Sequence, residues 1–274
     1  MSSVNTNVGA MIALQNLNAT SSELMSTQNR ISTGLKVASA KDDGAAFAIA
    51  QTQRATVSSL DAVKDSLSRG SSVVDVAMSA GSSVSDMLTQ LKEKALAASD
   101  TSLDTTSRNA LNADFTSIRD QITKTLSNAT FNGINLVDGT NSNITALANS
   151  DGTGKITVAG QNMSLGGSIV TLAATASFST ATSAANLLTT IDTSINNVSS
   201  SLASLGTSSK ALDNHAAFVS KLQDSITAGI GNLVDADMAK ESAKLQALQT
   251  KQQLGVQALS IANQSTGTVL SLFR

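Results

Sequence analysis

Two stretches of the chain repeat apolar residues at every seventh position, and this period limits the possible folds more than any other feature. In the first stretch, one register comprises Leu60, Leu67, Val74, Gly81, Leu88 and Ala95, and the other comprises Val63, Gly70, Ala77, Val84, Leu91 and Ala98. In the second, the strict register comprises Ile191, Val198, Leu205, Leu212, Val219 and Ile226, and a partial one comprises Leu188, Ile195, Leu202 and Ala216. Registers that alternate by three and four residues form the seam of a helix that packs along its length.

The absence of proline supports helices of this length. At average usage a chain of 274 residues has about 14 prolines, and this chain has none. Proline would remove a donor and clash inside a helix. We expect helices over about 43–98, 103–128 and 183–228, with Asp42 or Asp43 as the first N-cap and a break or bend at Gly229 and Gly231.

The segment between the last two of these helices has a different character. Thr, Asn, Ser, Gly and Ala dominate 139–182, Asp151-Gly152 has the composition of a turn, and Ile156 and Val158 alternate with polar neighbours. Just before it, Phe131-Asn132-Gly133-Ile134 carries a hairpin turn signal. We expect one or two short β-hairpins and surface loops within 130–182.

The two ends of the chain mirror each other. Apolar residues step by three, four or seven from Val4 to Ile31, where Ser32-Thr33-Gly34 ends the pattern, and a similar pattern runs from Met238 to Phe273. The predicted fold class is mainly α: a long antiparallel heptad-helix bundle, forming a rod, with paired terminal helices and a small β-hairpin region in the middle. The expected organisation is a terminal region at 1–42, an inner region at 43–230 and a second terminal region at 231–274.

The terminal helices carry very few charges. Residues 1–29 contain one charged side chain, Glu23, and 252–273 contain none. Two amphipathic helices bury only one stripe each when they pair, so the rest of their surface stays open to association. We expect other copies of the chain to order these helices, through Val4, Met11, Leu14, Leu17, Leu24, Ile31, Met238, Leu245, Leu248, Leu259, Val269, Leu272 and Phe273.

Composition excludes several classes of function. The chain has no cysteine, which excludes disulfides and Cys-ligated zinc, and its single histidine excludes a site that needs two imidazoles. With 14% charged residues and a net charge of −2, the chain lacks the excess of basic residues that binding to nucleic acid requires. The uncharged stretch at 252–273 holds too many polar side chains for membrane insertion. No basic region precedes an apolar one at the start, so we expect no conventional cleaved signal.

Three local features invite a chemical interpretation, and each has a simpler one. His215 fits a residue flanking a helix seam, Asp42-Asp43 fits a helix N-terminus, and Gly152-x-Gly154 fits a turn, because it lacks the Gly-Lys-Ser/Thr of a phosphate loop. We expect no enzyme activity, no cofactor and no metal. An extended, helical, self-associating structural protein is favoured over a membrane-active helical protein or a helical enzyme scaffold.

Several segments resemble bacterial flagellins. The stretch from Arg30 to Asp43 closely resembles the family's N-terminal signature, which continues to Ala50, and Phe131-Asn132-Gly133 matches another family landmark. Near the C-terminus, 235–241, 253–259 and 270–274 resemble the family's return segment and ending. The resemblance covers about 1–138 and 183–274, and it points to a short alphaproteobacterial type.

This resemblance implies an exported subunit of the flagellar filament, with a hook-filament junction protein as the alternative. The terminal regions at 1–42 and 231–274 would form the filament core, and 43–230 would form the surrounding layer. The implied partners are other flagellin subunits, including paralogues, together with hook-junction proteins, the filament cap and an export chaperone. The implied location is extracellular, in the filament, after type III export. A type III needle or translocator protein would lack the paired terminal signatures.

The resemblance also singles out a stretch where an animal innate receptor binds many flagellins. In the family this stretch carries an Arg, a Leu four residues later and a Glu on the next helix. Here Gln90 stands in place of the Arg, Lys94 in place of the Leu and Gln121 in place of the Glu. We expect these replacements to weaken or abolish recognition by that receptor.

Overall fold

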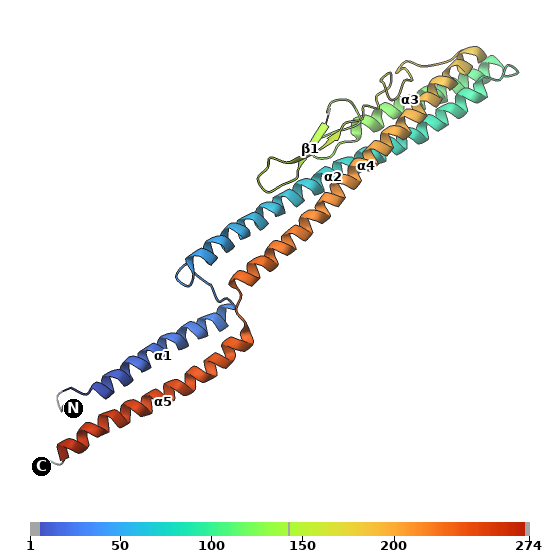
Figure 1. Cartoon of the computed structure of the whole chain (residues 1–274). Helices are drawn as coiled ribbons and strands as arrows, with labels where there is room; N and C mark the ends of the chain where they lie inside the picture. The colour runs from blue at the N-terminus through green and yellow to red at the C-terminus, as the bar shows by residue number, and fades with distance from the viewer. Residues whose placement is uncertain (1–5, 142, 272–274) are drawn as a thin grey trace. The chain divides into compact units, whose positions relative to one another are not determined.

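The computed structural model describes residues 6–141 and 143–271, with side chains through Gln264. They form two compact units: unit 1 from Met1–Ala55 with Ser225–Arg274, and unit 2 from Thr56–Asp224. The elements in chain order are α1 (Val8–Thr33), α2 (Gly44–Ala98), α3 (Thr105–Asn128), β1 (Asn143–Leu147), β2 (Lys155–Ala159), α4 (Ala181–Val234) and α5 (Met238–Ser271) (Figure 1). The predicted fold class, mainly α with a small antiparallel hairpin, is confirmed.

The core of unit 2 is an antiparallel pair formed by α2 and α4 (Figure 1). Lys92 and Asp192 form an ion pair of 2.7 Å between them, and at the other end of the pair the Gln223 amide donates to the Asp61 carboxylate at 2.8 Å. Every residue of the two registers predicted for α2 is buried. The sevenfold period therefore identified the packed face of this helix correctly.

The packed face of α4 is only partly the one expected. Its strict register is buried through Val219, but the residues of the predicted partial register are half-buried. Two serines, Ser194 and Ser201, are buried instead. The Ser194 hydroxyl donates to the Thr190 carbonyl and accepts from the Thr171 amide, so its burial leaves no donor or acceptor unmet.

A buried arginine closes the turn between α2 and α3. Arg108 is 8% exposed, and its guanidinium donates to the backbone carbonyls of Ala98, Asp100 and Leu103 at 2.9–3.0 Å. These bonds satisfy carbonyls where α2 ends and the turn begins, a place where helices leave acceptors without partners. They hold the start of α3 against the end of α2.

The middle segment, 130–182, buries more of its side chains than the sequence indicated. The strands β1 and β2 pair in antiparallel register, with Asn143 opposite Ala159, and Phe131 and Ile134 form a bridge around the expected turn. After β2, however, the chain buries four apolar side chains in what was expected to be a surface loop: Met163, Val170, Leu172 and Phe178. The Phe178 ring packs edge-on against Phe115 of α3, with centroids 5.2 Å apart. The loop covers part of the bundle.

The helix ends follow capping chemistry, with one correction. Gly34 ends α1 in the left-handed conformation, and the Asp43 carboxylate accepts from the Ala46 amide at the start of α2. By contrast, α4 passes through Gly229 and Gly231 and ends at Val234, beyond the expected end near 228. The buried side chains of Ile230 and Val234 offset the low helix propensity of the two glycines.

A candidate self-assembly surface on unit 1

Unit 1 is built on the antiparallel pairing of α1 with α5 (Figure 1). At one end of the pair, the Asn7 side chain donates to the Ala262 carbonyl at 2.8 Å. At the other end, the Arg30 guanidinium lies 3.4 Å from the Glu241 carboxylate. Between them Gly255 faces Leu17 so closely that a Cβ at Gly255 would lie 3.3 Å from the Leu17 side chain. A larger residue at this position of α5 would require the Leu17 side chain to shift.

Backbone bonds fix how the chain enters and leaves this pair. The amides of Lys36 and Val37 both donate to the Val234 carbonyl, and the Ala236 amide donates to the Gly34 carbonyl. Leu35 and Asp235 form an isolated β-bridge. The turn after α1 and the turn before α5 are thus joined to each other, which sets the two helices side by side.

The seam between α1 and α5 is narrow and partly polar. The buried residues of the two helices are Thr20, Thr27, Glu241 and Leu248. Of the positions predicted for self-assembly, Leu17, Leu24, Ile31, Leu245 and Leu259 are half-buried. Met11, Leu14 and Met238 are exposed. Val4, Leu272 and Phe273, and the side chain of Val269, lie outside the described residues.

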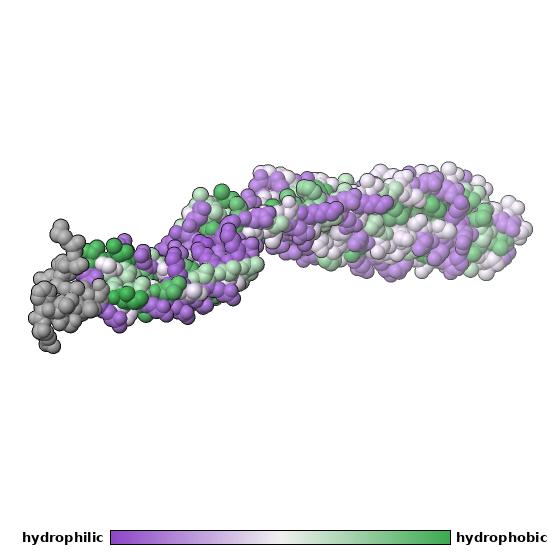
Figure 2. All heavy atoms as spheres, turned by 60° about the horizontal axis from the view of Figure 1, so that its bottom comes forward, coloured by the Kyte–Doolittle hydropathy of each residue, from purple (hydrophilic) through white to green (hydrophobic). Residues whose placement is uncertain are grey.

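The outer faces of the pair are unusually apolar. Exposed apolar side chains on α1 are Val8, Met11, Ile12, Leu14 and Met25, and those on α5 are Met238, Leu254, Val256 and Ile261. Figure 2 shows hydrophobic surface gathering over this unit, toward the free ends of the two helices. Exposed apolar area of this extent on paired helices is typical of a protein-protein contact.

Val8 follows the stepped pattern of α1 but was not among the predicted self-assembly positions. Sequence reasoning missed five further residues, which are Ile12, Met25, Leu254, Val256 and Ile261. All five lie off the seven-residue seam, which was the signal used to select candidates. The signal that would have found them is the presence of large apolar residues on every side of a helix that carries almost no charge.

A groove of about 410 Å³ runs between α1 and α5. Small residues such as Ala13, Ala19, Gly255 and Ala258 form much of its lining, and Glu23 and Lys251 stand at its edge. A second hollow, of about 580 Å³, lies over Val8, Met11, Ile12 and Leu14 of α1. Together they give unit 1 shallow surfaces for side chains from another helix.

The ion pair between Arg30 and Glu241 is only half satisfied. The Nε atom of Arg30 and the Oε2 atom of Glu241 are buried without a hydrogen-bond partner among the described residues. A buried polar atom without a partner costs free energy. This pair therefore weakens the contact between α1 and α5 relative to one with full hydrogen bonding.

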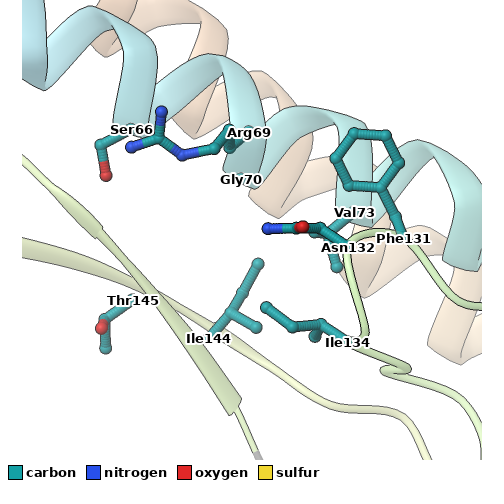
Figure 3. A pocket seen from close by; sticks show the side chains of 9 residues that line it. All are labelled: Ser66, Arg69, Gly70, Val73, Phe131, Asn132, Ile134, Ile144 and Thr145. Atoms are coloured by element: carbon teal, nitrogen blue, oxygen red, sulfur yellow. The ribbon is translucent and has the colours of Figure 1, made fainter.

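Unit 2 contains a smaller pocket, of about 130 Å³, between α2, β1 and the turn at 131–134. Figure 3 shows Ser66 and Arg69 reaching it from α2, Asn132 and Ile134 from the turn, and Ile144 from β1. The Ser66 hydroxyl accepts from the amide of Leu147, so this region attaches the hairpin to α2. The lining holds no carboxylate and no histidine, and so lacks the usual groups for general acid-base chemistry.

Two of the residues considered above for a chemical role, His215 and Asp42, form hydrogen bonds that hold the fold together. The Nε2 atom of His215 lies 2.7 Å from the Ala148 carbonyl, which ties the end of β1 to α4. Asp42 accepts from the amides of Ala38 and Ser39, and the bonds from Ser39 hold the pKa of the Asp42 carboxyl below its usual range. Among the described residues, no group of three or more His, Cys, Asp or Glu side chains could hold a metal ion. No described helix is long and apolar enough to cross a membrane.

The three positions of the altered receptor stretch lie on the surface of α2 and α3. Gln90 and Gln121 are exposed. Lys94 is half-buried, and its ammonium lies 2.7 Å from the carboxylate of Asp114 on α3. The lysine is therefore held in an ion pair on the face where the family carries an apolar residue.

Comparison with known proteins agrees with this architecture. The family model of the bacterial flagellin N-terminal helical region matches residues 4–142, and that of the C-terminal helical region matches 188–273. Flagellin FljM of Caulobacter vibrioides is 61% identical over 274 residues, which cover 100% of this chain and 99% of the relative. A flagellin of Brucella melitensis is 40% identical over 287 residues, which cover 100% of both chains.

Two solved structures share the fold at low sequence identity. The crystal structure of Bacillus cereus flagellin matches with a TM-score of 0.50 and 20% identity, over 56% of this chain and 87% of that one. A Vibrio parahaemolyticus protein described as flagellar hook-associated matches with a TM-score of 0.60 and 15% identity, over 71% and 100%. The full-length relatives and both family models confirm the resemblance seen in the sequence: the chain belongs to the bacterial flagellins of alphaproteobacterial type, the structural subunits of the flagellar filament.

Proposed function

We propose that unit 1 is the surface through which this flagellin assembles, with 1–42 and 231–274 forming the filament core and 43–230 the layer around it. The observation that carries the proposal is the exposed apolar surface of the α1/α5 pair, which includes Met11, Ile12, Leu254 and Ile261. Burial of that surface between subunits releases free energy in proportion to the apolar area removed from water.

Family membership supports the remaining functional proposals. The subunit is exported through the flagellar type III apparatus in a largely unfolded form and works outside the cell, in the filament. Its partners are other copies of the chain, paralogous flagellins, hook-junction proteins at the base, the filament cap at the tip, and an export chaperone that binds the C-terminal segment. It acts as a structural element and catalyses no reaction.

Deleting 252–274 tests the assembly surface. The truncated chain keeps α2, α3 and α4, so we expect a helical monomer that does not elongate filament seeds. The measurements are far-ultraviolet circular dichroism for helix content and light scattering after seeding. Elongation of the truncated chain at the wild-type rate would show that the C-terminal helix is not part of the assembly surface.

A point substitution gives a milder test. Leu259 is half-buried on α5, and Leu259→Asp places an unpaired charge among apolar side chains, which costs several kcal/mol, about 3 or more. Seeded elongation should stop while unit 2 stays folded. The matched control is Ser150→Asp, which adds the same charge to the exposed turn between β1 and β2 and should leave elongation unchanged.

A further inference from the structure

Glu23 and Lys251 mark the inner limits of the two uncharged ends of the chain. Glu23 is the only charged side chain in 1–29, and no charged side chain follows Lys251 before Arg274. From these two residues to their free ends, α1 and α5 carry no other charged side chain before Arg274. Each of these two charges therefore stands alone where the helices become apolar.

The fold brings both charges to the same groove. Glu23 from α1 and Lys251 from α5 line the depression between the two helices, and both side chains are exposed. Within the part of the chain that the structure describes, neither takes part in an ion pair of 4.0 Å or less. The acid and the base border one groove without neutralising each other.

Assembly changes the environment of both groups. When the apolar faces of unit 1 become buried between copies, a charge at their edge loses water, and a dehydrated charge without a partner is strongly unfavourable. The neighbouring uncharged segments offer no counterion. The opposite charge at the edge of another copy's groove can provide one.

We propose that Glu23 of one subunit forms an ion pair with Lys251 of a second subunit, and that this pair fixes how adjacent copies align. The inference rests on the proposed assembly surface. The pair joins two different groups, the acid of one copy and the base of the next, so the same contact can be repeated from subunit to subunit along a filament.

Charge reversal with mixing tests the pair. Glu23→Lys alone and Lys251→Glu alone each set like charges against each other in the contact, and each should raise the critical concentration for seeded growth about tenfold. A one-to-one mixture of the two variants restores opposite charges at every contact when the copies alternate. The mixture should grow at a critical concentration within about threefold of the wild type. The double variant should behave like the mixture.

Lys244→Glu is the matched control, because Lys244 is an exposed lysine of α5 that does not line the groove. We expect it to leave the critical concentration within about twofold of the wild type. Circular dichroism of each monomer checks that the helices are retained.

Two results would contradict the proposed ion pair between subunits. One is wild-type growth of both single variants. The other is rescue in the double variant without rescue in the mixture, because that result places the pair within one chain. Both differ from failure of the assembly surface itself, in which the chain lacking 252–274 would still polymerise.

Discussion

At the scale of single residues, two arginines show how differently this chain treats buried polar groups. Arg108 donates to three carbonyls at the turn between α2 and α3. Arg30 makes one contact of 3.4 Å with Glu241, and an atom on each side chain is left without a partner. The first arrangement stabilises unit 2, whereas the second leaves unit 1 with a weak polar contact inside its seam.

Replacing both members of the weak pair tests this view. In Arg30→Met with Glu241→Met, the unpaired polar atoms are exchanged for apolar groups of similar length; because the Arg30 side chain is 34% exposed, the expected gain in stability is smaller than for a fully buried ion pair. We expect slower amide hydrogen exchange in α1 and α5 of the monomer. Glu241→Met alone leaves Arg30 without its partner and should speed exchange. Faster exchange in the double variant would contradict the argument.

The sequence predicted apolar residues of the α1/α5 seam, but neither its buried polar residues Thr20, Thr27 and Glu241 nor the outer apolar surface. A seven-residue period shows which side chains share a face, so Leu17, Leu24 and Leu248 were found. It carries no information on how much of a helix a single neighbour covers, and so the exposure of Ile12 and Ile261 was missed. The role of Arg108 was also missed, because it depends on the path of the backbone at the turn.

At the scale of elements, the long helices were predictable because period and the absence of proline agree along their whole length. The end of α4 was not, since the cost of Gly229 and Gly231 is local while the burial of Ile230 and Val234 depends on the fold. The burial of Ser194 and Ser201 in α4 was not predicted either, because it also depends on the tertiary fold. A polar residue is placed in the seam only when a loop such as the one at Thr171 supplies its partner.

The glycines within α4 offer a direct measurement of helix propensity. A Cβ at Gly206 would meet no atom within 4 Å, so Gly206→Ala should stabilise unit 2 by about 1 kcal/mol and raise its unfolding temperature by about 2–4 °C. The contrasting variant is Gly139→Ala. Gly139 has a φ of +84°, and its Cβ would lie 2.7 Å from Asn162, so this change should lower the unfolding temperature. Thermal denaturation followed by circular dichroism decides both.

The start of α3 should respond to acid. A bond from the Ser107 side chain, with further backbone bonds, lowers the pKa of the Asp104 carboxyl, which also accepts from the Thr106 amide at the N-cap. A carboxyl with a lower pKa in the folded state contributes stability that is complete above its unfolded pKa, about 3.9, and is lost as the pH falls through the folded value. Carboxyl NMR should show Asp104 titrating below that value. Asp104→Asn, which keeps an acceptor, should remove its share of the acid sensitivity.

At the scale of the molecule, most of the large exposed apolar side chains among the described residues belong to unit 1. Unit 2 buries most of its apolar residues along α2, α3 and α4 but exposes Leu96 and Phe218, whereas unit 1 leaves nine large apolar side chains exposed in the described parts of α1 and α5 (Figure 2). On the proposed assembly surface, we expect unit 2 to be stable by itself and unit 1 to be stabilised by contact with other copies. The middle segment, 139–182, belongs to unit 2, and its polar turns are where extra sequence should be tolerated.

Inserting a short Gly/Ser tag after Asp151 tests that tolerance. The turn between β1 and β2 is exposed, and exposed polar turns accept insertions. We expect the tagged chain to fold and to elongate seeds, with the tag reactive on the outside of intact filaments. The same tag after Thr171, between the buried Val170 and Leu172, should unfold part of unit 2. Loss of assembly with the Asp151 insertion would contradict the outer location.

The resemblance to flagellins predicts that the contact with an animal innate receptor lies on α2 and α3. Where the family carries an Arg, a Leu and a Glu, this chain presents exposed Gln90 and Gln121, and Lys94 bound to Asp114 at 2.7 Å. Glutamine in place of arginine removes charge-assisted bidentate bonds, and a lysine at an apolar anchor must give up both water and its carboxylate partner to be buried. Either change alone costs about 2 kcal/mol, more than tenfold in affinity, so we expect weak or no activation by the monomer in reporter cells. The restored variant, Gln90→Arg with Lys94→Leu and Gln121→Glu, should gain activity without change in helix content. Activation by the unaltered chain at the concentrations that suffice for a receptor-competent flagellin would show that these three positions do not control recognition.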